Sequence, residues 1–168
     1  MIPAPAPRLL ETIPSTKLHP PRLARHQVAR EGLLERLRQA RERRCIVLQG
    51  PAGSGKTSIA VAWRQALLAQ QVEVAWLTLV GEDDEPRRLC ACILASLARI
   101  DPELVRPAAQ LLERDDDADA DELWVITLVQ SLGERGRELV LGLDDVQHLR
   151  HARIGRMLHW LLEYASPQ

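Results

Sequence analysis

One short stretch constrains this chain more than any other. Residues 50–57 read Gly-Pro-Ala-Gly-Ser-Gly-Lys-Thr, which is the pattern GxxxxGK followed by Ser or Thr. The apolar run 45–49 stands immediately before it, and a segment with helical apolar spacing, 56–70, overlaps its end. Strand, glycine-rich turn and helix in that order are the setting in which this pattern binds phosphate. The stretch therefore predicts an α/β fold with a phosphate-binding loop.

The residue types in this loop suit a triphosphate with its metal ion, so we expect ATP and Mg²⁺ as cofactors. Gly53 and Gly55 lack a Cβ, which lets the backbone turn tightly and present its N–H groups to phosphate oxygens. Lys56 can reach the terminal phosphates, and the Thr57 hydroxyl suits a bridging magnesium ion. The alternative is a tight glycine-rich turn with a surface lysine. The expected nucleotide-binding set is Gly50, Pro51, Ala52, Gly53, Ser54, Gly55, Lys56, Thr57 and Ser58.

A second part of the site is expected where the apolar run 139–143 ends in Asp144 and Asp145. Open α/β folds bind ligands at the carboxyl edge of the sheet, so these carboxylates should lie near the loop. We expect Asp144 to reach the magnesium ion, mainly through water, and Asp145 to orient or deprotonate an attacking water. Lys56 and Asp145 are thus the candidate catalytic residues, and Thr57 and Asp144 the candidate metal ligands. The alternative is a pair of acids that only caps a helix.

Apolar spacing along the chain predicts strands that alternate with helices. Such alternation favours a parallel sheet with helices on its faces, and with the loop it predicts a three-layer P-loop NTPase fold. Residues 1–26 are rich in proline and are expected to form an extended arm, with a P-loop ATPase domain over 27–168. Strands are expected at 45–49, 72–79 and 139–143, and helices at 30–44, 56–70, from 86 onward, 123–132 and 151–165. Residues 101–114 are expected to form a helical turn or a short helix.

Composition excludes several classes of protein. The net charge of −1, from 22 Lys and Arg against 23 Asp and Glu, provides no basic field for nucleic acid. No uncharged apolar run approaches the roughly 18 residues that span a membrane. We therefore expect no membrane partner. Three cysteines are too few for a disulfide framework, so we expect a cytoplasmic protein. Only Lys17 and Lys56 are lysines among the basic residues, which singles both out.

Several segments together resemble the large ATP-dependent LuxR-type transcriptional activators, the family of the maltose-regulon activator. These are signal-transduction ATPases with numerous domains. Val80 departs from the usual Asp of the family, and Gln147 stands where a His is common. The segments that carry the resemblance are Thr16-Lys17-Leu18, Pro21-Arg22, Val28-Ala29-Arg30, Leu33-Leu34, the phosphate loop, Trp63, Trp76-Leu77-Thr78-Leu79, Asp83-Asp84-Glu85-Pro86 and Asp144-Asp145.

The resemblance implies a nucleotide switch. ATP would drive self-association, and Val28 and Arg30 would lie against the adenine. DNA binding would come only from domains outside this chain. The family's sheet has five parallel strands in the order 5-1-4-3-2, so three strands would make an incomplete sheet. We therefore expect an N-terminal piece of a longer protein that binds ATP and ADP, hydrolyses ATP slowly, and is marginally stable or self-associating.

Other functions remain open at the level of the sequence. An accessory AAA-like ATPase that acts on a nucleic-acid machine would share the phosphate loop and the strand-end acids, which are the Walker A and Walker B patterns. A fragment that holds ATP without turnover would share them too. A P-loop kinase for a small molecule is less consistent, because its substrate acids follow the first strand closely.

Overall fold

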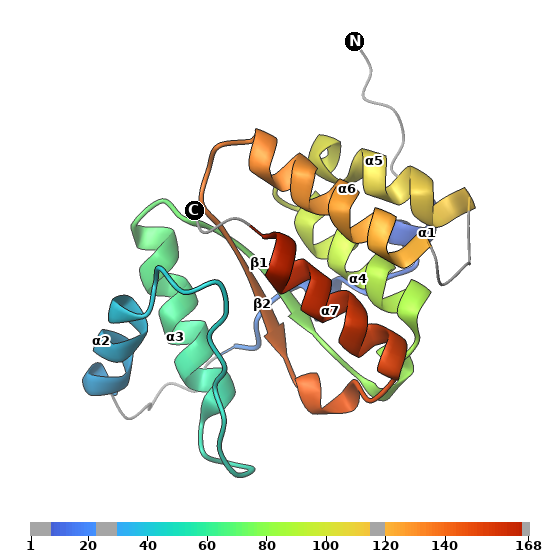
Figure 1. The fold of residues 1–168 in the computed structure, drawn as a ribbon. Coiled ribbons are helices and arrows are strands. Elements are labelled where there is room, and N and C mark those ends of the chain that lie inside the picture. The colour runs from blue at the N-terminus through green and yellow to red at the C-terminus, as the bar shows by residue number, and fades with distance from the viewer. Residues whose placement is uncertain (1–7, 23–29, 115–119, 166–168) are drawn as a thin grey trace.

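The computed structural model describes residues 8–22, 30–114 and 120–165. Within these ranges, two parallel strands lie between a pair of helices on one side and a group of helices on the other (Figure 1). No helix among the described residues has both the length and the apolar character to cross a bilayer. The helices are α1 (Arg8–Glu11), α2 (Glu31–Gln39), α3 (Lys56–Ala69), α4 (Pro86–Ala98), α5 (Pro102–Arg114), α6 (Ala120–Glu134) and α7 (Ala152–Tyr164), and the strands are β1 (Glu73–Thr78) and β2 (Leu139–Asp144).

The two strands pair in parallel, in a register that brings their carboxyl ends together. Glu73 lies opposite Leu139 at one end of the ladder, and Thr78 lies opposite Asp144 at the other. The strands predicted at 72–79 and 139–143 are therefore present, as neighbours. Their parallel pairing confirms the predicted α/β class and places the acids after β2 at the same sheet edge as the end of β1.

The strand predicted at 45–49 is absent, so the sheet of the described residues has two strands where three were expected. This segment has no regular secondary structure, and Val47 is 79% exposed. An apolar run becomes a strand only if a neighbour offers its backbone groups for a ladder. Among the described residues β2 pairs with β1 alone, so 45–49 has no partner strand. Its residues are exposed or only half-buried.

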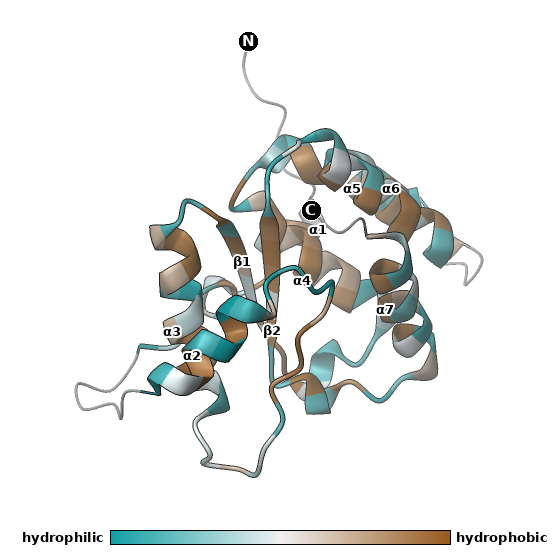
Figure 2. Ribbon diagram, turned by 60° about the vertical axis from the view of Figure 1, so that its left-hand side comes forward, coloured by the Kyte–Doolittle hydropathy of each residue, from teal (hydrophilic) through white to brown (hydrophobic). Residues whose placement is uncertain are grey.

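Apolar side chains on the two faces of the sheet enter two separate clusters, which defines the three layers. Val74 and Val140 pack with Leu67 of α3 on one face. Ala75 and Leu77 belong to the main core on the other face, which α4, α5, α6 and α7 complete. Figure 2 shows the hydrophobic colouring concentrated on the strands and on the inner sides of the helices. This alternation follows from the period of two along a strand.

The N-terminal segment packs against this core rather than running free of it. Leu10 and Ile13 are buried members of the main cluster, and α1 contacts α4. A short 3-10 turn, Ser15–Leu18, then lies beside β1. The described part of the predicted extended arm thus contains two short helical turns, and it ends near the carboxyl edge of the sheet.

Candidate nucleotide-binding site

The predicted phosphate loop adopts backbone conformations that require glycine. Gly53 and Gly55 have φ of 73° and 80°, in the left-handed region that side chains with a Cβ disfavour. A Cβ on Gly50 would lie 2.8 Å from the Ser54 Oγ, so a side chain at this position would require the Ser54 hydroxyl to move. Ser54 N donates to the Pro51 carbonyl at 3.2 Å, which closes the turn. The loop then leads directly into α3.

Lys56, the first residue of α3, turns back over the loop. Its Nζ donates to the carbonyl oxygens of Gly50 and Pro51, both at 3.0 Å. The ammonium group is therefore held beside the loop backbone, close to the N-terminus of a fourteen-residue helix. Both features favour an anion at this position, because the helix N-terminus presents free N–H groups and a positive partial charge.

Thr57 and Asp144, the two predicted metal ligands, are in direct contact. The Thr57 Oγ1 donates to Asp144 Oδ1 at 3.0 Å, although the residues stand 87 positions apart in the chain. Thr57 is in the first turn of α3, and Asp144 is the last residue of β2. Their hydroxyl and carboxylate oxygens are the hard ligands that Mg²⁺ prefers.

This donor set fits a magnesium ion that arrives with a nucleotide. The described residues contain no group of three or more His, Cys, Asp or Glu that could hold a metal ion by itself. Magnesium in nucleotide sites usually takes one or two protein oxygens and completes its shell with water and phosphate oxygens. The Thr57 and Asp144 pair supplies that number, so the site suits a shared ion rather than a closed protein cage.

Asp145 follows β2 in a left-handed conformation, with φ of 60°. The Gln147 Nε2 donates to Asp145 Oδ1 at 2.8 Å. The Asp145 backbone N donates to Asp144 Oδ1 at 3.1 Å. These contacts tie the two acids together at the strand end. Gln147, where the resembling family commonly has His, therefore contacts the residue predicted to handle the attacking water.

A cavity of about 630 Å³ lies at this edge of the sheet. The strand-end acids and Thr57 line one side of it together with Thr78, the last residue of β1. Residues of the N-terminal segment line the rest, and these were not assigned to the site from the sequence. Only the Thr16-Lys17-Leu18 and Pro21-Arg22 patterns, quoted for the resemblance, could have pointed to them. The full lining is Ser15, Thr16, Lys17, His19, Pro20, Pro21, Thr57, Thr78, Asp144 and Asp145.

The remaining predicted residues divide into described and undescribed ones. Arg30 lies against the loop, because its guanidinium Nη2 would be 3.2 Å from a Cβ on Gly55. Ala52 is exposed in the loop, and Ser58 is half-buried in the first turn of α3. Val28, expected to pack on the adenine, lies outside the described residues.

Comparison with known families decides the class. The sequence profile described as the AAA ATPase domain matches residues 26–163, which include the loop, both strands and most of α7. The chain belongs to the AAA ATPase domain family. The AAA ATPase domain match and the helices around a short parallel sheet agree with the fold class predicted from the sequence.

Curated relatives of this AAA ATPase domain are much longer proteins. This chain is 29% identical over 150 residues to the serine/threonine-protein kinase PknK of Mycobacterium tuberculosis. The match covers 89% of this chain and 13% of that protein. It is 26% and 25% identical over 152 residues to the HTH-type transcriptional regulators MalT of Cronobacter sakazakii and Klebsiella pneumoniae. Those two matches cover 90% of this chain and 16% of each regulator.

Proposed function

We propose that this chain is an ATP-binding, slowly hydrolysing switch module of a transcriptional regulator. The observation that carries the proposal is the contact between Thr57 and Asp144 beside the glycine-dependent loop. It joins a hydroxyl, a carboxylate and a phosphate-binding backbone in one place. The similarity to two HTH-type transcriptional regulators supports the regulatory role.

In this proposal each residue has one task at the triphosphate. Lys56 and the loop N–H groups balance the phosphate charge, with Arg30 adding a second cation near Gly55. Thr57 and Asp144 hold magnesium, which supplies charge stabilisation to the terminal phosphate when it is bound. Asp145 accepts a proton from the attacking water as the bond to the leaving ADP oxygen breaks. The Gln147 amide already occupies one Asp145 oxygen, which is consistent with slow turnover.

The partners of the module follow from the same assignment. ATP and ADP are its ligands, self-association is its output, and DNA would be read by other parts of a longer protein. The free Cys45, Cys90 and Cys92 suit the reducing cytoplasm. The AAA profile match equally supports a second candidate, an accessory ATPase that acts on a nucleic-acid machine. A module that binds ATP without turnover is separated from both by a hydrolysis assay.

Calorimetric titration with ATP tests the proposal, with and without magnesium. Thr57→Ala should weaken magnesium-dependent binding by at least about tenfold, because it removes a ligand of the bridging ion. Thr57→Ser keeps the hydroxyl and should stay within about threefold of the parent chain by the same reasoning. Thr127→Ala is a matched control, since the Thr127 hydroxyl donates to the Leu123 carbonyl within α6. Equal affinities for the parent chain and Thr57→Ala would overturn the proposal.

A further inference from the structure

The N-terminal segment Ser15–Pro21, here called the arm wall, supplies six of the ten residues that line the cavity. Thr57, Asp144 and Asp145, which the proposed function uses, line the same cavity. The arm wall therefore faces the end of the site where the metal ion and the terminal phosphate would lie. A ligand group there would meet arm residues as well as the residues of the sheet edge.

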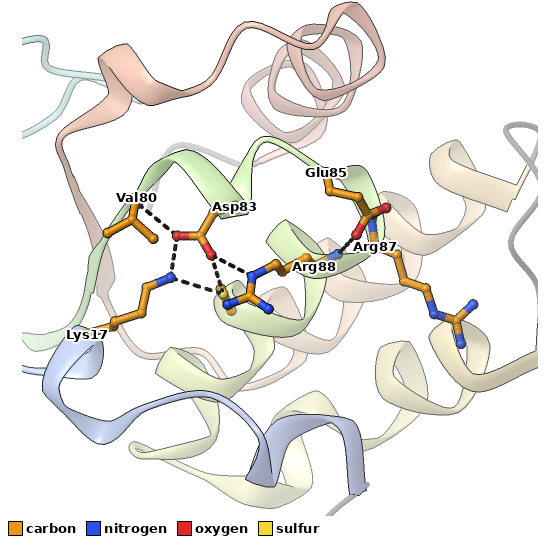
Figure 3. A network of polar contacts seen from close by, with 7 residues as sticks. Lys17, Val80, Asp83, Glu85, Arg87 and Arg88 are labelled. Atoms are coloured by element: carbon orange, nitrogen blue, oxygen red, sulfur yellow. Dashed lines mark hydrogen bonds and ion pairs between the residues drawn. The ribbon is translucent and has the colours of Figure 1, made fainter.

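A buried ion pair fixes the arm wall in place. The Lys17 Nζ donates to Asp83 Oδ2, and the two residues are 8% and 0% exposed (Figure 3). Asp83 belongs to the turn Gly81–Asp83 that follows β1. Burying two charges costs several kcal/mol in desolvation, so such a pair holds only with close geometry and further hydrogen bonds. The pair thus specifies one position of the arm.

Asp83 receives those further hydrogen bonds from elements behind the cavity. The Val80 N donates to Oδ2 at 2.8 Å, and the Arg88 Nε donates to Oδ1 at 3.1 Å (Figure 3). The Cys92 thiol donates to Oδ1 at 3.5 Å, and burial raises the pKa of this thiol to about 11, which keeps it protonated. Burial by itself would raise the pKa of Asp83, but the contacts from Lys17 and Val80 outweigh it and leave the pKa below its ordinary value.

The residue after this turn, Asp84, contacts the loop that follows β2. Asp84 Oδ1 accepts hydrogen bonds from the backbone N of Arg150 at 2.7 Å and of His151 at 2.8 Å. These residues follow the strand-end acids by a few positions. Two adjacent carboxylates, Asp83 and Asp84, therefore hold the arm wall and the loop after β2.

We propose that the arm wall is part of the nucleotide site and that Lys17 is a positioning residue, which holds this wall over the metal and terminal-phosphate end through Asp83. The inference rests on the proposed function. The arm wall would then sense whether the terminal phosphate is present. A diphosphate leaves that end of the cavity empty of phosphate, so the arm wall should matter for ATP and much less for ADP.

The test compares affinities for ATPγS and ADP, both with magnesium, by calorimetry on the full chain. Lys17→Met should weaken ATPγS binding by at least about fivefold and change ADP binding by less than about twofold. Lys17→Met combined with Asp83→Asn removes both charges, so no unpaired charge stays buried, and it should show the same selective loss. Arg88→Met is the matched control, because it removes another partner of Asp83 that does not line the cavity. It should leave the ratio of the two affinities unchanged.

Hydrogen exchange provides a readout that a purely structural ion pair would not move. In the parent chain, ATPγS with magnesium should slow exchange of the amides in 15–19, and ADP should not. A folded double variant with the parent ratio of affinities would overturn the inference. The inference would also be overturned if ATPγS slowed amide exchange of the parent chain at 50–57 and left it unchanged at 15–19. This measurement needs no variant, so it holds even if both variants fail to fold. A parent chain that binds no nucleotide would overturn the proposed function, and this inference with it.

Discussion

Single residues at the carboxyl edge of the sheet differ in how firmly they are held. Asp83 is enclosed by four polar partners, whereas Asp145 is held by one side-chain amide at the cavity. A carboxylate locked by ion pairs has little freedom to exchange protons, while one beside a cavity can face a bound water. The residue that should carry proton transfer is therefore Asp145.

Asp145→Asn is expected to separate binding from hydrolysis. Asn tolerates the left-handed backbone at this position, so the fold should be retained. The affinity for ATP should stay within about twofold, while the rate of ATP hydrolysis should fall at least about tenfold, because an amide cannot accept the proton. Single-turnover assays measure the rate, and Asp101→Asn at the start of α5 is a remote control. Equal turnover in Asp145→Asn and the parent chain would remove Asp145 from the mechanism.

Tyr164, the one tyrosine of the chain, gives a direct test of a contact between α6 and α7. Its hydroxyl donates to Glu122 Oε1, and this hydrogen bond, followed by burial, raises its pKa to about 12. The contact therefore stabilises the fold below the ordinary value of 10.0, and this contribution disappears as the pH rises through about 12. Absorbance titration should follow a single phenol that ionises near the higher value. Glu122→Gln should move the midpoint towards 10, and an unshifted midpoint would contradict the contact.

At the scale of elements, the sequence predicts helices better than strands. The helical spacing within one segment is local, and α3, α4, α5, α6 and α7 lie where that spacing put them, with ends shifted by a few residues. The run 45–49 has the composition of a strand but lacks a neighbour, and no local pattern reveals that. The predicted loop residues could be found for the same reason as the helices, since they are contiguous. The arm residues that line the cavity could not, because their contacts depend on tertiary packing.

Helix α4 begins with a cap that the sequence did not lead us to expect. Pro86 at its first position predicted where the helix starts. The residue before it, Glu85, is the N-cap, and its side-chain carboxylate accepts from Arg87 N at 2.9 Å and Arg88 N at 2.6 Å. Glu85→Ala should lower the free energy of unfolding by about 1 kcal/mol, because it removes an N-terminal cap. Denaturant unfolding measures the loss. Glu82→Ala, at an exposed position of the preceding turn, should have a much smaller effect, and equal losses would contradict the capping role.

For the molecule as a whole, the free edge of β2 is the surface that most favours association between chains. Among the described residues β2 has β1 as its sole partner strand, and all of its residues are only half-buried. Val47, in the unpaired segment 45–49, is among the most exposed apolar side chains described. Unpaired strand edges and exposed apolar runs favour pairing between chains.

We expect this chain to self-associate with rising concentration, and Val47→Lys to reduce that association. A lysine in this exposed apolar run opposes the approach of a second chain and costs little at a surface position. Sedimentation velocity over a range of concentrations measures the effect. Leu123→Lys is the matched control, since Leu123 is 53% exposed on α6, away from the sheet edge. A parent chain that stays monomeric, or equal effects of both substitutions, would contradict the prediction.

The contact between Thr57 and Asp144 also has a consequence for the order in which the site assembles. The phosphate loop is made from consecutive residues, whereas its metal partner comes 87 positions later. Local structure forms faster than contacts between distant residues. During synthesis, the loop should therefore be able to hold phosphate before the chain contains the carboxylate that completes the magnesium site. A nascent chain would gain affinity for the anion first and dependence on the cation only after β2 has paired with β1.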